Sequence, residues 1–253
     1  MNLHLNWPFI LLFFAGLWAG IQNTLAGGGS FITLPALILA GLNPLIANIT
    51  STVALFPAQV ASGLSGRSLV VGVGKLSFRS LMLVSLAGGI IGAILLLSTP
   101  SNVFARLVPW LVLFATVVFT WGNFFRKPPA DGQAHIGPRA AAAAQFLISI
   151  YGGYFGGGIG FLMMAALTLA GLPARQSAAN KNVLAAVMNL AAVLVFAFSP
   201  NIAWLQAAIL SAGAIIGSLL GASALKRVND RILRMAIVGI GIALTIGLFL
   251  KPI

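Results

Sequence analysis

Two runs of three glycines, Gly27–Gly29 and Gly156–Gly158, each precede an apolar segment of only 11 residues. A helix of that length measures ~17 Å, which is too short for a hydrocarbon core of ~30 Å. The first N–H groups of a helix lack intrahelical partners and form the positive end of its dipole. We call each glycine run, together with the helix N-terminus that follows it, a glycine tip. Because glycine also admits a ligand close to the backbone, the two glycine tips could bind an anion, with Ser30 as a helix cap. Close packing of helices through small residues is the structural alternative.

Polar side chains follow each short segment by about ten residues. The two sets are Thr50, Ser51 and Thr52, and then Asn180, Lys181 and Asn182. Hydroxyl and amide groups can donate hydrogen bonds to the oxygens of an oxyanion. We therefore predict that both sets face the glycine tips, although helix capping and hydrogen bonds between helices use the same residue types.

Lys181 is the sharpest single candidate. If a helix continues from the polar turn at Arg175, Lys181 lies six residues further along, or ~9 Å deeper. An ammonium buried in a membrane protein is costly and usually functional, and the alternative is a side chain that reaches back to the interface. Gln59 and Asn189 hold matching places deeper in the two halves and could line the same cavity or join helices. Three further residues just before the glycine runs could also contact a ligand: Asn23, Tyr151 and Tyr154.

The composition is that of a membrane protein. Of 253 residues, 60% are hydrophobic and only 6% are charged, whereas about a quarter of the residues of a soluble domain are charged. The apolar residues form ten segments, eight of them long enough to cross a bilayer and two short. We predict a single all-α transmembrane domain over residues 1–253, with eight long helices and two short ones that follow the glycine tips.

The second half of the chain repeats the first. A shift of 130 residues places Ala26–Phe31 on Gly156–Phe161, and a shift of 125 places Gly88 and Gly92 on Gly213 and Gly217. The predicted repeats are about 1–125 and 140–253, joined by a linker over 126–139. Each repeat has five segments, an odd number, so the second repeat is inverted in the membrane. Inverted repeats with short segments in matching places are typical of secondary transporters.

Basic residues give an orientation. The chain has 14 Lys and Arg against two acids, and cytoplasmic loops of membrane proteins collect Lys and Arg. The basic stretches are 66–79, 126–139 and 226–231, whereas 1–7, 41–45, 99–103 and 199–202 contain none. We therefore predict a multi-pass protein of a bacterial inner membrane with an extracytoplasmic N-terminus.

Several classes of chemistry are not expected. The chain has no Cys, and its two His, His4 and His135, do not approach the ligand spacing of a metal site. No nucleophile and base are paired, so we expect neither an enzyme nor a cofactor, and we expect no nucleic-acid partner. Both acids, Asp131 and Asp230, fall in predicted loops. With no carboxylate among the spans, we favour anion movement down its electrochemical gradient or weak proton linkage.

The first glycine run begins a longer motif. It comprises Gly27-Gly28-Gly29-Ser30-Phe31, Leu34-Pro35-Ala36-Leu37, Gly41-Leu42-Asn43-Pro44 and Ala47-Asn48-Ile49-Thr50-Ser51-Thr52. This motif resembles the first-repeat signature of the sulfite exporter TauE/SafE family, and the second glycine run resembles the second repeat of that family. The resemblance implies an inner-membrane permease for small sulfur-containing anions such as sulfite, sulfoacetate or related sulfonates. The chain departs from the family at Asn180–Asn182, in place of an Ala-x-x-Thr-Ser type stretch, and at Met163 or Met164, in place of a proline.

The predicted function is transport of such an anion by alternating access, with membrane lipid around the protein and its oligomeric state left open. An anion channel that uses the glycine tips as a filter is the alternative; an intramembrane enzyme and a structural subunit are further rivals. The predicted substrate-binding residues are Gly27, Gly28, Gly29, Ser30, Thr50, Ser51, Thr52, Gln59, Gly156, Gly157, Gly158, Asn180, Lys181, Asn182 and Asn189.

Overall fold

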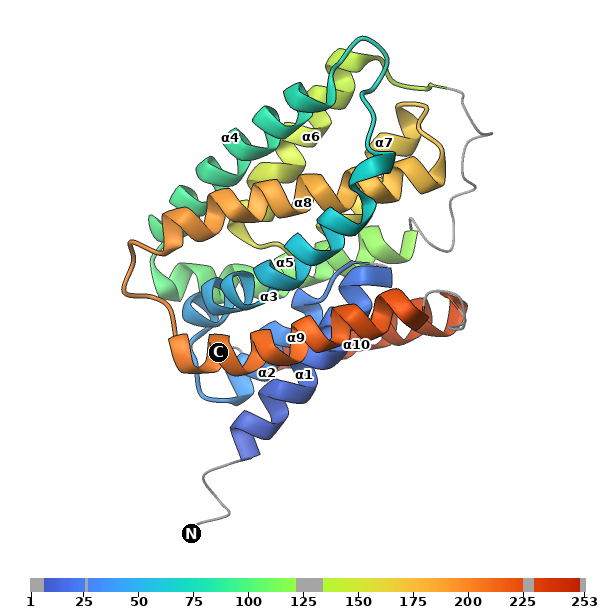
Figure 1. Ribbon diagram of the computed structural model, residues 1–253. Helices are drawn as coiled ribbons and strands as arrows, with labels where there is room; N and C mark the ends of the chain where they lie inside the picture. The colour runs from blue at the N-terminus through green and yellow to red at the C-terminus, as the bar shows by residue number, and fades with distance from the viewer. Residues whose placement is uncertain (1–6, 26, 122–133, 225–229, 251–253) are drawn as a thin grey trace.

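The computed structural model describes residues 7–25, 27–121, 134–224 and 230–250, and in these ranges the chain is a bundle of helices (Figure 1). The helices are α1 (Trp7–Leu25), α2 (Ser30–Leu39), α3 (Pro44–Gly66), the 3-10 turn η2 (Arg67–Leu69), α4 (Phe78–Leu97), α5 (Ser101–Thr120), α6 (Pro138–Tyr154), α7 (Ile159–Leu169), α8 (Ala174–Phe196), α9 (Trp204–Ala224) and α10 (Asp230–Leu250). The all-α prediction is confirmed. The predicted N-terminal segment 1–6, His4, Asp131 and most of the linker lie outside the described residues.

The glycine runs interrupt the helices as predicted. α1 ends at Leu25 and α2 begins at Ser30, and α6 ends at Tyr154 before α7 begins at Ile159. The short helices have 10 and 11 residues. Five of the described helices, namely α3, α4, α5, α8 and α9, are long and apolar enough to cross a membrane. Large apolar side chains such as Trp110 and Phe198 are exposed on the outside, as suits a surface that faces lipid.

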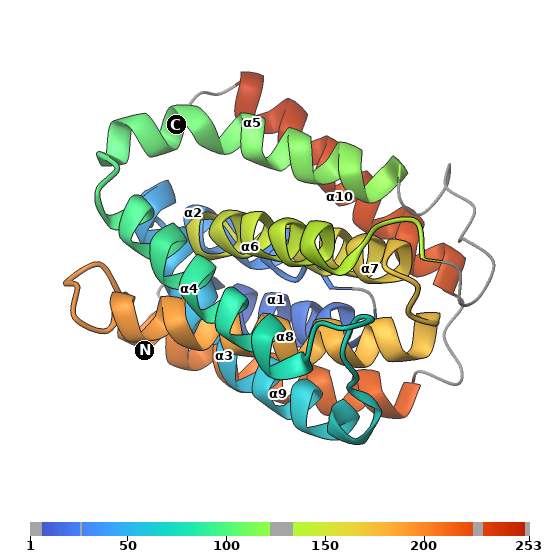
Figure 2. The same ribbon diagram turned by 90° about the horizontal axis from the view of Figure 1, so that it is seen from above.

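The two halves of the chain interlock. α3 and α8 pack together in the middle, with α4 and α6 on one side and α1 and α9 on the other (Figure 1). Thus α1 packs against α9, and its counterpart α6 packs against α4, while α5 and α10 pair at one edge (Figure 2). Each contact therefore has its counterpart in the other half, which is the pattern of two repeats related by a two-fold axis. The boundaries 1–125 and 140–253 themselves stay a prediction.

Glycines hold these outer helix pairs at close range. A Cβ atom at Gly217 of α9 would lie 1.9 Å from Leu17 O of α1, and one at Gly92 of α4 would lie 2.1 Å from Ile150 O of α6. Gly92 and Gly217 are the residues that the 125-residue shift aligns. The repeated glycines thus fix α1 to α9 and α4 to α6 by backbone contact.

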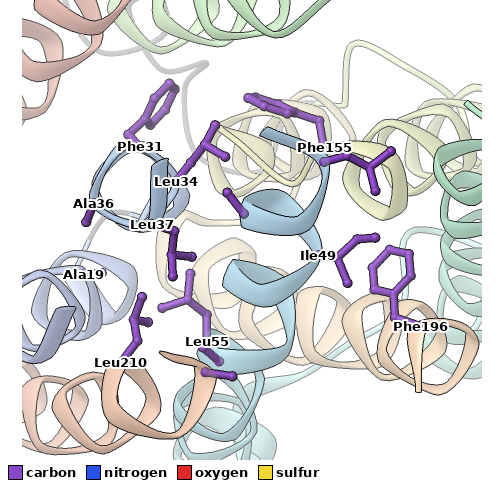
Figure 3. Packing of buried hydrophobic residues seen from close by; sticks show 14 of the residues in the cluster. Ala19, Phe31, Leu34, Ala36, Leu37, Ile49, Leu55, Phe155, Phe196 and Leu210 are labelled. Atoms are coloured by element: carbon purple, nitrogen blue, oxygen red, sulfur yellow. The ribbon is translucent and has the colours of Figure 1, made fainter. Parts of the chain in front are cut away.

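Buried apolar side chains fill the space between α2 and the first half of α3. Phe31, Leu34 and Leu37 of α2 pack in one cluster with Ile49 and Leu55 of α3 (Figure 3). Asn43 is the N-cap of α3, because its Oδ1 accepts the N–H of Ile46, and the helix begins at Pro44. The first half of α3 is therefore part of the apolar core.

Candidate functional site

The two glycine tips touch each other. A Cβ atom on Gly27 would lie 3.3 Å from Gly160 Cα, and one on Gly156 would lie 3.8 Å from Ser30 Oγ. Gly27 and Gly156 have φ angles of +85° and +79°, which side chains with a Cβ atom rarely adopt. The positive φ favours glycine at both positions, and at Gly27 the close approach of Gly160 does so as well. Because each run lies against the first turn of the other short helix, the tips belong to one structural unit.

Side chains of α1 hold the first tip in place. Gln22 Nε2 donates to Gly28 O at 2.9 Å, and the N–H of Gly29 donates to Asn23 Oδ1 at 2.7 Å. The prediction that Ser30 caps α2 is wrong, because the N-cap is Gly29 and no side chain of α2 forms a cap hydrogen bond. The carbonyl oxygen that serves this helix end comes from Asn23, because the last turn of α1 lies against the tip.

A small cavity lies where the tips meet. Its lining residues are Asn23, Gly27, Gly28, Ser30, Gln59, Ser62, Gly156, Ile159, Gly160, Lys181, Asn182 and Ala185. Ser30 and Ile159 are the first residues of α2 and α7, so the N-terminal ends of both short helices border the cavity. Its volume is about 30 Å³, which is enough for one or two water molecules.

Among the described residues of that lining, Lys181 is the only one with a charged side chain. It is 5% exposed and has no hydrogen-bond or ion-pair partner among the residues that the structure describes. Asn23 Nδ2 is also buried and without a described partner. The cavity therefore presents an ammonium, a free amide donor and two positive helix ends, an arrangement that favours an anion. No group of three metal-ligating side chains occurs in the described ranges.

The structure brings part of the predicted site together. Seven predicted residues line the cavity: Gly27, Gly28, Ser30, Gln59, Gly156, Lys181 and Asn182. The other predicted residues, Gly29, Thr50, Ser51, Thr52, Gly157, Gly158, Asn180 and Asn189, are not part of its lining.

Several of the latter have partners in the protein. Asn180 Nδ2 donates to Val71 O at 2.7 Å, and the N–H of Val71 donates to Asn180 Oδ1 at 3.0 Å, so its amide holds the loop after η2. Thr50 Oγ1 accepts the N–H of Ala203 at 3.1 Å. Thr52 Oγ1 donates to Asn48 O in the preceding turn. Asn180 and Thr50 thus hold neighbouring loops, whereas Thr52 is bonded within its own helix.

Two polar lining residues are not in the predicted set. Asn23 stands one turn before the first glycine run, and that position is the signal by which the sequence pointed to it as a possible contact. Ser62 is one of two serines, with Ser65, in the second half of α3 and carries no comparable signal. Arg67 and Arg106 are exposed and are not among the lining residues of the cavity.

The cavity is confined to one half of the bundle. Gln59 and Ser62 lie in the second half of α3, and Lys181 and Asn182 lie in the first half of α8. These are the halves toward the helix ends at Arg67 and Arg175. The 130-residue shift matches Lys181 with Ser51 and Ala185 with Leu55. Ser51 and Leu55 are each 1% exposed and are not among the lining residues, so this cavity has no part in the other half at these positions.

Comparison with known proteins agrees with this architecture. The family model described as "Sulfite exporter TauE/SafE" matches residues 12–248. The chain is 30% identical over 244 residues to "Probable membrane transporter protein ORF9" of a Sinorhizobium species, covering 95% of this chain and 92% of that protein. It is 29% identical over 236 residues to a "Probable membrane transporter protein" of Haemophilus influenzae, covering 90% and 89% of the two chains.

A third relative, "Probable membrane transporter protein YfcA" of Escherichia coli K12, is 26% identical over 240 residues, covering 91% and 86% of the two chains. No solved structure matches the chain. All three relatives carry names of transporters, in agreement with the expectation that the chain is not an enzyme. Because the family model spans both glycine tips and all ten helices apart from short ends, the chain belongs to the sulfite exporter TauE/SafE family of membrane transporters.

Proposed function

We propose that the protein carries a small sulfur-containing anion, such as sulfite, sulfoacetate or a related organosulfonate, across the bacterial inner membrane. The observation that carries this proposal is the unpaired ammonium of Lys181 in a cavity bordered by the N-terminal ends of α2 and α7. The cargo class follows from the family description and from the donor set of the cavity. Transport as such follows from the names of the relatives.

The cavity has a donor for each part of an oxyanion head group. Lys181 supplies the full charge, and a charge-assisted hydrogen bond from an ammonium is stronger than one between neutral groups. Asn23 Nδ2 supplies a donor that no described residue uses. The N–H groups at the start of α2 and α7 add donors and the positive helix ends without any further side chain.

The size and position of the cavity favour alternating access. A volume of about 30 Å³ holds one or two waters, whereas a sulfur oxyanion has at least four heavy atoms, so the site must widen to bind it. On the other side of the tips the matching residues Ser51 and Leu55 are buried and do not line this cavity. A carrier opens one half at a time, while a channel needs a continuous path through both.

The basic loops at Arg67 and Arg175 assign the half with the cavity to the cytoplasmic side. The conformation described here is then closed toward the outside. The extracytoplasmic position of the N-terminus follows from the same rule and belongs to the proposal.

Transport into liposomes tests the proposal. Purified protein is reconstituted, and uptake of [³⁵S]sulfite is measured without oxygen, together with thermal-shift measurements on sulfite, thiosulfate, sulfoacetate, taurine and sulfate. We expect saturable uptake and stabilisation by at least one sulfur anion, both lost in Lys181→Glu. Ohmic single-channel current would support the channel instead, and neither flux nor stabilisation by any of these anions would overturn the proposed cargo.

A further inference from the structure

We propose that the protein works as an anion exchanger: a bound anion must neutralise Lys181 before the site can close, so the loaded carrier changes sides much faster than the empty one. This inference rests on the proposed function and adds its mode of coupling. The carrier would swap an anion on one side for an anion on the other, and net movement of one anion species would be slow.

The first observation concerns Ser51, the residue of the first repeat that matches Lys181, and its surroundings. The repeat shift matches Lys181 with Ser51 and Met163 with Thr33. Ser51 is 1% exposed, and its hydroxyl is hydrogen-bonded to that of Thr33. When the two repeats exchange their environments during transport, Lys181 enters a site of this kind, without access to water and beside Met163.

The second observation is that the protein provides little to balance the charge there. Met163 is fully buried and has only a thioether, which is a weak acceptor. None of the described lining residues is a carboxylate, and no described residue pairs with Lys181. An ammonium that is buried without a counter-charge costs far more than a buried ion pair.

Few amide oxygens of the cavity are free to accept a hydrogen bond from the Lys181 ammonium. Gln59 Oε1 already accepts from Asn189 Nδ2, and Asn23 Oδ1 already accepts the N–H of Gly29. Asn182 directly follows Lys181 on α8, and residues one apart on a helix do not face each other. A bound anion is therefore the counter-charge that the closed site lacks.

The kinetic consequence can be measured on the unmodified protein. Liposomes are loaded with [³⁵S]sulfite without oxygen, the membrane potential is clamped, and efflux is followed with and without unlabelled sulfite outside. We expect efflux to be at least about tenfold faster with sulfite outside, because the carrier then returns loaded. A tenfold ratio corresponds to about 1.4 kcal/mol in the barrier. Equal rates would overturn the inference.

Variants connect the effect to the charge. In Lys181→Gln, measured at saturating sulfite, the ratio of exchange to net efflux should fall toward one, because the empty site no longer buries an ammonium. Lys181→Arg should keep a high ratio, and so should Arg175→Gln, which removes an exposed positive charge six residues earlier on the same helix. A ratio in Lys181→Gln as high as in the parent would show that Lys181 does not control closure.

The two proposals fail in different ways. Sulfite flux that is equally fast with and without sulfite outside overturns exchange alone and leaves the proposed cargo intact. The absence of any sulfite flux in the parent overturns sulfite as the cargo and the inference with it. A channel would carry net sulfite current without sulfite on the opposite side, which also contradicts the requirement for exchange.

Discussion

Asn189 donates a hydrogen bond from Nδ2 to Oε1 of Gln59 at 2.5 Å, and the two residues hold matching positions in the two repeats. A residue that contacts its own counterpart lies at the axis that relates the repeats. The bond joins α3 to α8 at the edge of the cavity, because Gln59 is also a lining residue. A movement of α3 relative to α8 at this point would therefore break the bond.

A double-mutant cycle should detect this bond. Gln59→Ala and Asn189→Ala should each lower the free energy of unfolding, with a coupling energy of about 0.6 kcal/mol, as measured for hydrogen bonds between membrane helices. Unfolding of the two single variants and the double variant in detergent provides the measurement. Additive effects within error would show that the contact contributes no coupling to stability.

Lys181 should dominate anion affinity. Lys181→Ala should weaken binding by ~2 kcal/mol, the value of a lost charge-assisted hydrogen bond, Lys181→Arg should keep part of the affinity, and Lys181→Glu should abolish it by repulsion. Calorimetry on the purified variants with sulfite measures the three affinities, and Arg175→Ala is the matched control on the same helix. If Lys181→Glu binds sulfite like the parent, the anion site depends on the helix N-termini alone.

Gly160 tests ligand access at the glycine tips. It lies in the first turn of α7 and lines the cavity, so Gly160→Ala should reduce sulfite transport severalfold per folded protein. The melting temperature is measured beside it, because Gly160 Cα lies at the close contact with Gly27. Gly247→Ala, on α10 with no atom within 4 Å of the added Cβ, should change neither. Gly27→Ala should lower stability by about 1 kcal/mol or more, because its φ of +85° strains a residue with a Cβ atom. Unchanged transport in Gly160→Ala would place the bound anion elsewhere.

A reversible cross-link should trap the conformation with the cavity on the basic side. The hydroxyls of Thr33 and Ser51 are hydrogen-bonded at 2.5 Å, so Thr33→Cys with Ser51→Cys should form a disulfide in this naturally Cys-free chain. Oxidation should stop transport, because Ser51 can no longer turn toward a cavity on the other side, and reduction should restore it.

The control cross-link joins helices that do not need to separate. Thr24 and Ser218 have hydroxyls 3.0 Å apart between α1 and α9, which glycine contacts already hold together. The corresponding cysteine pair should leave transport unchanged when oxidised. Full transport by the oxidised Thr33 and Ser51 pair would argue against alternating access.

Cysteine labelling tests the orientation. Ser68→Cys, in the loop after α3, should be protected from an impermeant thiol reagent in intact cells, whereas Ser101→Cys, at the start of α5, should react. Both serines are exposed, whereas Gly72 in the same loop is unsuitable because a Cβ atom there would lie 2.4 Å from Leu76 O. Labelling of position 68 but not 101 from outside would reverse the orientation and place the cavity on the outer side.

The sequence alone determined the helical architecture and the interruption of its helices at the tips. Three glycines before an 11-residue apolar segment cannot continue a helix across a bilayer, and the same pattern in both halves predicts a paired structure. The burial of Lys181 also followed from the sequence, because six helical residues carry a side chain ~9 Å past the turn at Arg175.

Only the tertiary structure decided which polar residues face the cavity. Asn180, Lys181 and Asn182 are adjacent, yet Asn180 binds the loop at Val71 while the next two line the cavity. Consecutive helical residues point about 100° apart, and α8 packs against α3, α4, α6 and α7, so its apolar pattern does not mark one inward face. The surroundings of matching positions also came only from the structure. Lys181 lines the cavity, whereas its counterpart Ser51 is hydrogen-bonded to Thr33, for which the second half has Met163. A thioether is a weak acceptor, so Met163 gives Lys181 no such partner.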